Sequence, residues 1–236
     1  MKTPVNSRTL RQHLAYSWWK YAMVIVLGAM AVNLYFTVTA YKPPEEKKVL
    51  MYVYGVSDET ALNGYMDSVR SEQLPEMEEM YSLTLSTDGT YGPMQLSTYV
   101  AAGEGDLYIL PRDQFVSLAT SGAWVALEED TELTSIFAER DLSLQSGWRR
   151  DPDSGVSHLY GIPISQLPGL QRYVYVENGY LCALITNGND DNVLKFMRIL
   201  CGDMLDAPPA AEGAPEASDP QASPESAAPE TTEPAE

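Results

Sequence analysis

The chain contains 236 residues, of which 44% are hydrophobic, and it carries a formal net charge of −18. This hydrophobic content is typical of a globular protein, and the acidity excludes nucleic acid as a partner, because a phosphate backbone would be repelled. The charge is unevenly distributed along the chain. Residues 1–20 contain four bases and no acid, whereas residues 206–236 contain eight acids and no base.

The first element in chain order is an uncharged stretch from Tyr21 to Tyr41. As an α-helix rising about 1.5 Å per residue, it is long enough to cross the roughly 30 Å hydrocarbon core of a bilayer. Tryptophan and tyrosine rings near its ends suit the membrane–water interface. The basic segment 1–20 precedes it, so the positive-inside rule predicts a single-pass protein of the cell membrane, with a cytoplasmic N-terminus and an extracytoplasmic C-terminal part.

A cleaved signal peptide is the alternative for the same stretch. The small residues of "VTA", 38–40, are ones that a signal peptidase accepts. However, the apolar run is longer than the roughly 7–15 residues of a signal peptide, and a long segment precedes it. We therefore interpret 21–41 as a transmembrane helix and leave cleavage open.

The remainder divides into three parts. Residues 42–48 contain two adjacent prolines and several charges, and they are predicted to form a short spacer. Residues 49–205 are long enough to form one domain with its own core. Residues 206–236 are rich in proline, alanine and glutamate and, from Ala207 onward, lack large apolar side chains, so this tail is predicted to be disordered.

Strand-like and helix-like patterns alternate within the domain. Strands are predicted at 48–56, 81–86, 106–111 and 158–165, and helices from Asp58 to about Met80 and at 93–104, 112–123 and 190–204. The dipeptide Asn178-Gly179 inside "RYVYVENGYLCALI" predicts a hairpin of two further strands, and 128–157 is predicted to be a helix-containing excursion. The alternation predicts an α/β fold of βαβ units, with a mostly parallel sheet flanked by helices.

The segment "YVAAGEGDLYILPRDQFVSLATSGAWVALEE", 99–129, resembles the first lobe of bacterial extracellular solute-binding proteins of the two-lobed, periplasmic-binding-protein type 2 topology. The residues that carry the resemblance are Ala101-Ala102-Gly103, Asp106, Leu107–Leu110, Gly122 and Leu127. Three further segments resemble that lobe's first strand, the strand leading to its hinge, and the segment returning from the second lobe. In the same order, these segments are "KVLMYVYGV", "YGIPIS" and "GYLCALITNGNDDNVLKFMRIL".

The chain departs from this family at the hinge. Where the family inserts a whole second lobe, this sequence has only "QLPGLQRYVYVE", 166–177. A dozen residues cannot form a domain with a core of its own. The resemblance over 49–204 therefore implies a single lobe with an open shelf in place of a closing cleft, on a transmembrane helix instead of the family's lipid anchor.

Ligands of parallel α/β sheets meet the carboxyl ends of the strands. Five side chains near the predicted strand ends are candidates to line a shelf that binds a small molecule: Tyr54, Ser57, Asp88, Tyr91 and Arg112. The alternative is that they are turn and capping residues. Similarly, Trp148-Arg149-Arg150 either binds an acidic partner or balances nearby acids.

Cys182 and Cys201 leave two alternatives open: a disulfide outside the cell, or two buried free thiols. The cysteine spacing and the separation of the two histidines do not fit a metal site, so neither metal nor cofactor is expected. His158 opens a predicted strand, and we interpret it as a core or surface residue. Without an expected pairing of nucleophile and base, the sequence does not favour an enzyme.

These observations lead to two hypotheses. The first is a single-pass membrane protein that displays a degenerate solute-binding-like domain for protein interaction or scaffolding in the envelope. The alternative is a ligand-binding or sensor component that presents solute to an ABC-type transporter or a signalling partner.

Overall fold

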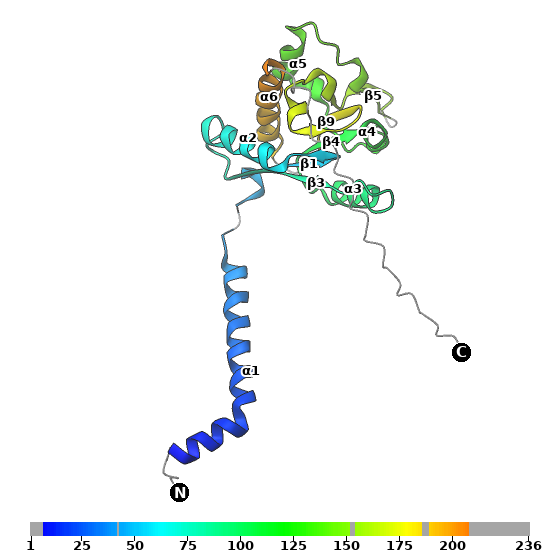
Figure 1. Ribbon diagram of the computed structural model, residues 1–236. Coiled ribbons are helices and arrows are strands. Elements are labelled where there is room, and N and C mark those ends of the chain that lie inside the picture. The colour runs from blue at the N-terminus through cyan, green and yellow to red at the C-terminus, as the bar shows by residue number, and fades with distance from the viewer. Residues whose placement is uncertain (1–6, 42, 152–153, 186–188, 208–236) are drawn as a thin grey trace, which may run out of the picture. The chain divides into compact units, whose positions relative to one another are not determined.

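The computed structural model describes residues 7–41, 43–151, 154–185 and 189–207 (Figure 1). The chain divides into two units, 1–44 and 45–236, which are described separately below. Almost all of the acidic tail predicted to be disordered, from residue 208 onward, lies outside the described residues.

The first unit contains helix α1, Ser7–Thr39. Its part Trp18–Thr39 has a mean hydropathy of 1.9, and it is the one helix among the described residues that is long and apolar enough to span a membrane. The hydroxyls of Thr37 and Thr39 donate hydrogen bonds to the carbonyls of Asn33 and Tyr35. Those polar side chains are therefore satisfied within the helix, as an apolar environment requires.

A five-stranded sheet forms the centre of the second unit, in the order β3-β1-β4-β9-β7. The strands are β1 (Lys48–Tyr54), β3 (Glu79–Leu85), β4 (Leu107–Pro111), β7 (Ile162–Pro163) and β9 (Gly179–Ala183). Strand β1 pairs in parallel with β3 and β4, whereas β9 runs antiparallel to β4 and β7. The mostly parallel sheet expected from the sequence is thus confirmed.

Helices cover both faces of this sheet because strand side chains alternate between them. The helices are α2 (Glu59–Glu72), α3 (Tyr91–Ala102), α4 (Arg112–Ala119), α5 (Thr131–Ala138) and α6 (Asp190–Asp206). Helices α2, α5 and α6 pack on one side, which we call the aliphatic face. Helices α3 and α4 pack on the other, the aromatic face. Figure 1 shows α2 and α6 on the side of the sheet opposite to α3.

Short elements complete the domain. The 3₁₀ helices are η1 (Glu45–Lys47), η2 (Leu127–Glu129), η3 (Gln145–Gly147), η4 (Ile164–Gln166) and η5 (Leu170–Arg172). Two antiparallel pairs lie outside the main sheet: β2 (Val56–Ser57) with β8 (Val174–Tyr175), and β5 (Trp148–Arg150) with β6 (Ser157–Leu159). The predicted excursion at 128–157 therefore contains α5 and leads into a hairpin.

The predicted hairpin around Asn178-Gly179 is wrong. The two flanking strands do not pair with each other, because β8 pairs with β2 whereas β9 joins the main sheet beside β4 and β7. The chain turns through Val176–Gly179, where the Gly179 N–H donates to the Val176 carbonyl at 3.2 Å and Asn178 has a φ of 49°. Asparagine tolerates this left-handed conformation, so the dipeptide marks a turn between strands of two different sheets.

The predicted strand 158–165 is divided into β6, β7 and η4. The division occurs at Gly161, where a Cβ would lie 2.9 Å from the Phe115 ring and 3.1 Å from the Cys182 sulfur. Only a glycine allows the backbone this close to the aromatic face. The chain therefore leaves the β5–β6 hairpin here and enters the main sheet.

Strand β3 lies at one edge of the sheet. Side chains of helix α2 accept hydrogen bonds from the backbone N–H groups on the outer side of this strand. The Asn63 Oδ1 accepts hydrogen bonds from the Ser82 N–H at 2.6 Å and the Ser82 hydroxyl at 3.0 Å. Glu59 accepts from the Thr84 N–H at 2.7 Å. These contacts satisfy donors that an edge strand would otherwise present to another chain.

Candidate functional site

The carboxyl ends of three parallel strands meet at one edge of the sheet. Strands β1, β3 and β4 end at Tyr54, Leu85 and Pro111. The five predicted shelf residues all follow or end these strands: Tyr54, Ser57, Asp88, Tyr91 and Arg112. We call this edge the shelf, and the role of the five residues in binding stays a prediction.

Tyr54 lies beneath the start of α3. Its side chain is buried, and burial, followed by the charge of Asp88, raises its pKa. A Cβ at Gly92 would lie 2.6 Å from the Tyr54 hydroxyl oxygen, so a glycine is needed for α3 to approach. Tyr54 therefore supports the shelf from below.

Two of the other shelf residues make polar contacts within the lobe. The Ser57 hydroxyl is 2.5 Å from the Thr84 hydroxyl. The Asp88 carboxylate accepts from the Thr90 N–H at 3.0 Å, immediately before α3. The Asp88 contact is that of a turn residue, whereas the Ser57 contact joins β2 to β3.

Three of the shelf residues, Asp88, Tyr91 and Arg112, are exposed to solvent, and Asp88 is engaged by its contact with Thr90. Tyr91 is 71% exposed at the start of α3, and Arg112 is exposed at the start of α4. Within the part of the chain that the structure describes, neither side chain has a hydrogen bond or an ion pair. They are the groups of this set that remain available to a partner.

Sequence reasoning missed three exposed apolar residues near the same edge. Val56 and Tyr175 lie opposite each other in the β2–β8 pair, and the Tyr175 side chain is 69% exposed. Met94 is exposed three residues after Tyr91, on the same side of α3. The helical spacing could have indicated Met94, but nothing in the sequence indicated the pairing of Tyr175 with β2.

The connection 166–177, which is too short to form a second lobe, lies between β7 and β9. Leu167 and Leu170 are fully buried in the domain's own core. The Gly169 N–H donates to the Met204 carbonyl at 2.8 Å, and the Tyr173 carbonyl accepts from the Asp58 N–H at 2.8 Å. The connection therefore folds back onto its own lobe, and the described residues contain one sheet-centred lobe.

Cys182 and Cys201 are free and buried. Cys182 lies on the aromatic face, whereas Cys201, on α6, lies on the aliphatic face. Burial raises the pKa of both thiols. The sheet separates the two sulfurs, so the structure has the free-thiol alternative and not the disulfide.

His158 pairs with an acid. Its Nδ1 is 2.5 Å from one oxygen of Glu128, whose other oxygen accepts from the Leu159 N–H at 2.8 Å. Among the described residues, no serine, threonine or cysteine side chain has a hydrogen bond to this histidine, and no group of three or more metal-ligating side chains is found. The pair links η2 to β6 at the edge of the core.

The basic residues after Trp148 are also used locally. The Arg149 guanidinium lies 5.1 Å from the centre of the Phe115 ring and donates to the Trp148 carbonyl at 2.6 Å. The Arg150 Nε donates to the Gly155 carbonyl at 2.9 Å. These contacts link the β5–β6 hairpin to α4 and stabilise its turn, and the binding of an acidic partner stays a prediction.

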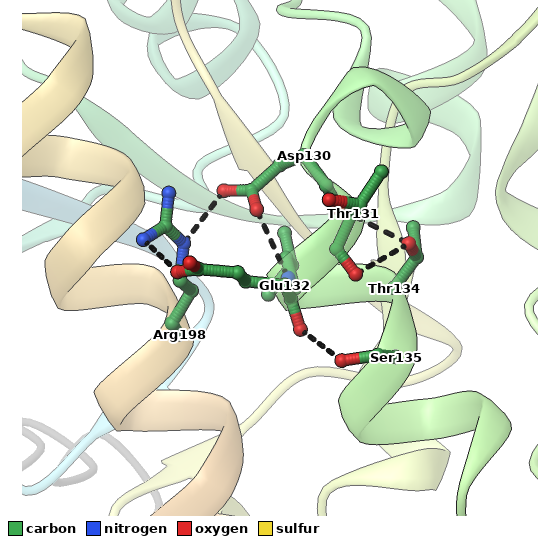
Figure 2. Close-up of polar contacts among 7 residues, drawn as sticks. Asp130, Thr131, Glu132, Thr134, Ser135 and Arg198 are labelled. Carbon is green, nitrogen blue, oxygen red and sulfur yellow. Dashed lines mark hydrogen bonds and ion pairs between the residues drawn. The ribbon is translucent and has the colours of Figure 1, made fainter.

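A charged network joins α5 to α6. Figure 2 shows Arg198 between Asp130 and Glu132, to which it donates at 2.8 and 2.5 Å. Asp130 also accepts from the Leu133 N–H at 3.0 Å and thereby caps α5. A shallow hollow of about 320 Å³ lies beside this network.

A larger cavity of about 560 Å³ lies at the opposite edge of the sheet, where β1 and β4 begin. We call it the amino-end cavity. The segment that follows α3 forms part of its lining, together with η1 and the first half of β1. Sequence reasoning did not predict it.

No protein-family model matches the chain, and no curated protein matches it. Similar solved structures include an extracellular solute-binding protein of family 1 from Alicyclobacillus acidocaldarius, with a TM-score of 0.37, 20% identity, and coverage of 52% of this chain and 28% of that one. An N-glycan transport solute-binding protein from Streptococcus pneumoniae has a TM-score of 0.36 and 18% identity, covering 51% and 25%.

An ABC substrate-binding protein from Listeria monocytogenes, in complex with cycloalternan, has a TM-score of 0.32 and 18% identity, covering 48% of this chain and 28% of that one. The chain thus spans about a quarter of the length of these structures. The matches are to solute-binding proteins, the family that the sequence resembles.

Proposed function

We propose that the chain is a single-pass membrane protein whose degenerate solute-binding-like lobe acts outside the cell in protein interaction or scaffolding. The observation that carries this proposal is the connection 166–177, whose leucines, Leu167 and Leu170, are buried in the core of the same lobe. Among the described residues no second lobe faces the shelf, so this part of the chain leaves the shelf open to solvent. Tight binding of small molecules usually requires a site that buries most of the ligand.

The exposed side chains near the shelf support a protein partner. Tyr91, Met94 and Tyr175 present large apolar surfaces to solvent. Tyrosine, methionine and arginine are enriched at protein interfaces, and Arg112 lies at the same edge. An open surface of this composition suits a folded partner better than a small solute.

Helix α1 supports membrane attachment. Its part Trp18–Thr39 is apolar and exposed, and the basic segment 1–20 precedes it. We propose that this helix is retained as an anchor, with the N-terminus in the cytoplasm and the lobe outside. N-terminal sequencing of the mature protein tests retention: a new N-terminus after residue 40 would show a cleaved signal peptide.

Site-specific photocrosslinking in intact membranes tests the partner. A benzoylphenylalanine at position 175 or 91 is expected to give a discrete crosslinked product, because these side chains point to solvent near the shelf. The matched control is the same probe at Glu139, which is exposed at the end of α5. Equal crosslinking at all three positions would mean nonspecific collision and would contradict the proposal.

Thermal denaturation tests the competing function, in which the lobe presents a solute to a transporter or a signalling partner. A ligand at a hundred times its Kd stabilises the native state by about 2.7 kcal/mol, which raises the melting temperature. We expect no such rise when the full chain in detergent is screened against sugars and uncharged peptides. A rise that disappears in the Tyr91→Ala variant would replace scaffolding by solute binding.

A further inference from the structure

The amino-end cavity is separate from the shelf. It opens where β1 and β4 begin, whereas the shelf lies where these strands end. Its volume of about 560 Å³ is within the range of small-molecule sites. A ligand there would not compete with a partner bound at the shelf.

Hydrogen bonds hold the wall of this cavity in place. The Asp106 carboxylate accepts from the Leu50 N–H at 2.8 Å, and the Asp106 N–H donates to the Leu50 carbonyl at 2.9 Å. The buried Asn189 donates to the Lys48 carbonyl at 2.5 Å. Gly105, with a φ of 78°, lies so close to the Tyr52 ring that a Cβ would be 2.6 Å from it. The cavity is therefore preformed, which lowers the cost of binding.

The charge of the lining is negative. Four carboxylates and one ammonium group contribute to it: Glu45, Glu46, Glu104, Asp106 and Lys48. Lys48 donates to Glu45 at 2.9 Å, and this ion pair balances one of the four acids. Asp106 is already engaged by the Leu50 N–H, whereas the exposed Glu46 and Glu104 carboxylates have no hydrogen bond or ion pair among the described residues. The lining thus favours a cation.

The remaining lining is aromatic and aliphatic. Tyr52 and Tyr81 contribute rings, and Leu83 and Ile185 expose hydrocarbon to the solvent. The Tyr52 ring is buried and stacks on the Tyr99 ring at a centroid distance of 5.0 Å, so the partly exposed Tyr81 ring is the one that can contact an ammonium group. Tyrosine faces attract ammonium groups, and exposed hydrocarbon favours an organic ligand. The described acids do not cluster as metal ligands, so a bare metal ion does not fit.

We propose that the amino-end cavity binds an organic ammonium cation, that is, an ammonium group on a short apolar chain. Glu46, Glu104 and the Tyr81 ring attract the charge, while Leu83 contacts the hydrocarbon. The same chemistry is offered by a free alkylamine and by the lysine side chain of another protein. This site is independent of the proposed shelf function.

Calorimetric titration of the full chain in an uncharged maltoside detergent tests the proposal with two matched pairs of probes. Pentylammonium is compared with pentanol, and N-acetyl-lysine amide with N-acetyl-norleucine amide. We expect each charged probe to bind at least about tenfold more tightly than its neutral counterpart, because neutral probes lack both the ion–carboxylate and the cation–π attraction. The tighter of the two charged probes identifies the source, a free amine or a protein lysine.

Two variants test whether the charged probes bind in the amino-end cavity. The double variant Glu46→Gln/Glu104→Gln is expected to weaken the charged probes by about three- to tenfold, since each exposed charge contributes a few tenths of a kcal/mol to about 1 kcal/mol. Glu139→Gln on α5 is the matched control and should leave affinity unchanged. Equal binding of charged and neutral probes, no binding of any probe, or no effect of the double variant would overturn the proposal. Shelf crosslinking is a separate readout, so the two proposals can fail independently.

Discussion

The two faces of the central sheet are built from different side chains. On the aliphatic face, β1 contributes Val49, Met51 and Val53, which pack against methionines, leucines and phenylalanines of α2, α5 and α6. On the aromatic face, the alternate residues Tyr52 and Tyr54 pack with Tyr108, Phe115, Trp124 and Tyr180. Strand β1 thus contributes aliphatic side chains to the core on one face and tyrosine rings, which carry polar hydroxyls, to the other face.

Because the two faces differ in composition, we expect the aliphatic face to determine stability and the aromatic face to support binding. A tyrosine ring is apolar, but its hydroxyl reaches toward a polar group, so tyrosines can extend from the core to the surface. Tyr54 extends beneath the shelf, and Tyr52 extends to the amino-end cavity. Both candidate binding regions are therefore connected to the aromatic face, whereas we expect the aliphatic face to contribute mainly packing energy.

The largest expected loss of stability comes from removing a large side chain from the core on the aliphatic face. Phe196 on α6 is fully buried, so Phe196→Ala should lower the free energy of unfolding by about 3–5 kcal/mol through lost burial and a new cavity. Near-ultraviolet circular dichroism during urea unfolding of the full chain in detergent measures this. If the two faces are separate, affinity for ammonium probes stays unchanged in the folded variant.

The neighbouring Lys195→Ala is the control for this prediction. Lys195 is half exposed and pairs with Glu76 at 3.9 Å, so its loss should change stability by less than about 0.5 kcal/mol. A Phe196→Ala variant as stable as this control would mean that α6 does not pack on the sheet as described.

A smaller effect is expected where α5 and α6 meet at the edge of the aliphatic face. Arg198→Met would remove the guanidinium from Asp130, whose side chain is only 5% exposed. An unpaired buried carboxylate is costly, but Arg198 is itself partly exposed and the Leu133 N–H remains bonded to Asp130, so we expect a loss of about 1–3 kcal/mol. Chemical denaturation measures it.

Glu132→Gln separates the two halves of this network (Figure 2). Glu132 is 74% exposed, so its bond to Arg198 is screened by water and its replacement should cost less than about 0.5 kcal/mol. Equal losses in both variants would contradict the view that the buried carboxylate dominates.

The next largest loss of stability is expected at β3, the strand at one edge of the sheet. Asn63→Ala would leave the N–H and hydroxyl of Ser82, which is fully buried, without their acceptor. One unsatisfied buried donor costs about 1–3 kcal/mol, and the better helix propensity of alanine offsets part of it. Asn63→Asp retains the accepting oxygen and should stay closer to the wild type. A concentration-dependent increase in size for Asn63→Ala alone, measured by light scattering, would show edge pairing.

Much of the architecture could be predicted because local patterns and tertiary structure agree. The alternation of Val49, Met51 and Val53 with Tyr52 and Tyr54 indicates a strand buried on both faces. The Asp58 side chain accepts from the Ala61 N–H, as the predicted helix start requires. The predicted α/β fold follows from repeating such signals along the chain.

What could not be predicted depends on contacts between distant segments. The pairing of Tyr175 with Val56 and the close approach of Gly161 to Phe115 have no local signature. The shelf residues could be located because they follow predicted strands. The amino-end cavity could not, since its lining combines η1, α3 and the segment after β9, whose relative positions the sequence alone does not specify.

The smallest expected effect is that of a reducing agent, which should be zero. Cys182 and Cys201 lie on opposite faces of the sheet, so dithiothreitol has no bond to break and the unfolding midpoint should not move. Because burial raises the pKa of both thiols, they stay protonated near neutral pH and should resist iodoacetamide in the native protein. Unfolding without reductant should then allow two alkylations, counted by mass spectrometry. If alkylation instead required reductant, a disulfide would join α6 to β9, and the separation of the two faces would have to be abandoned.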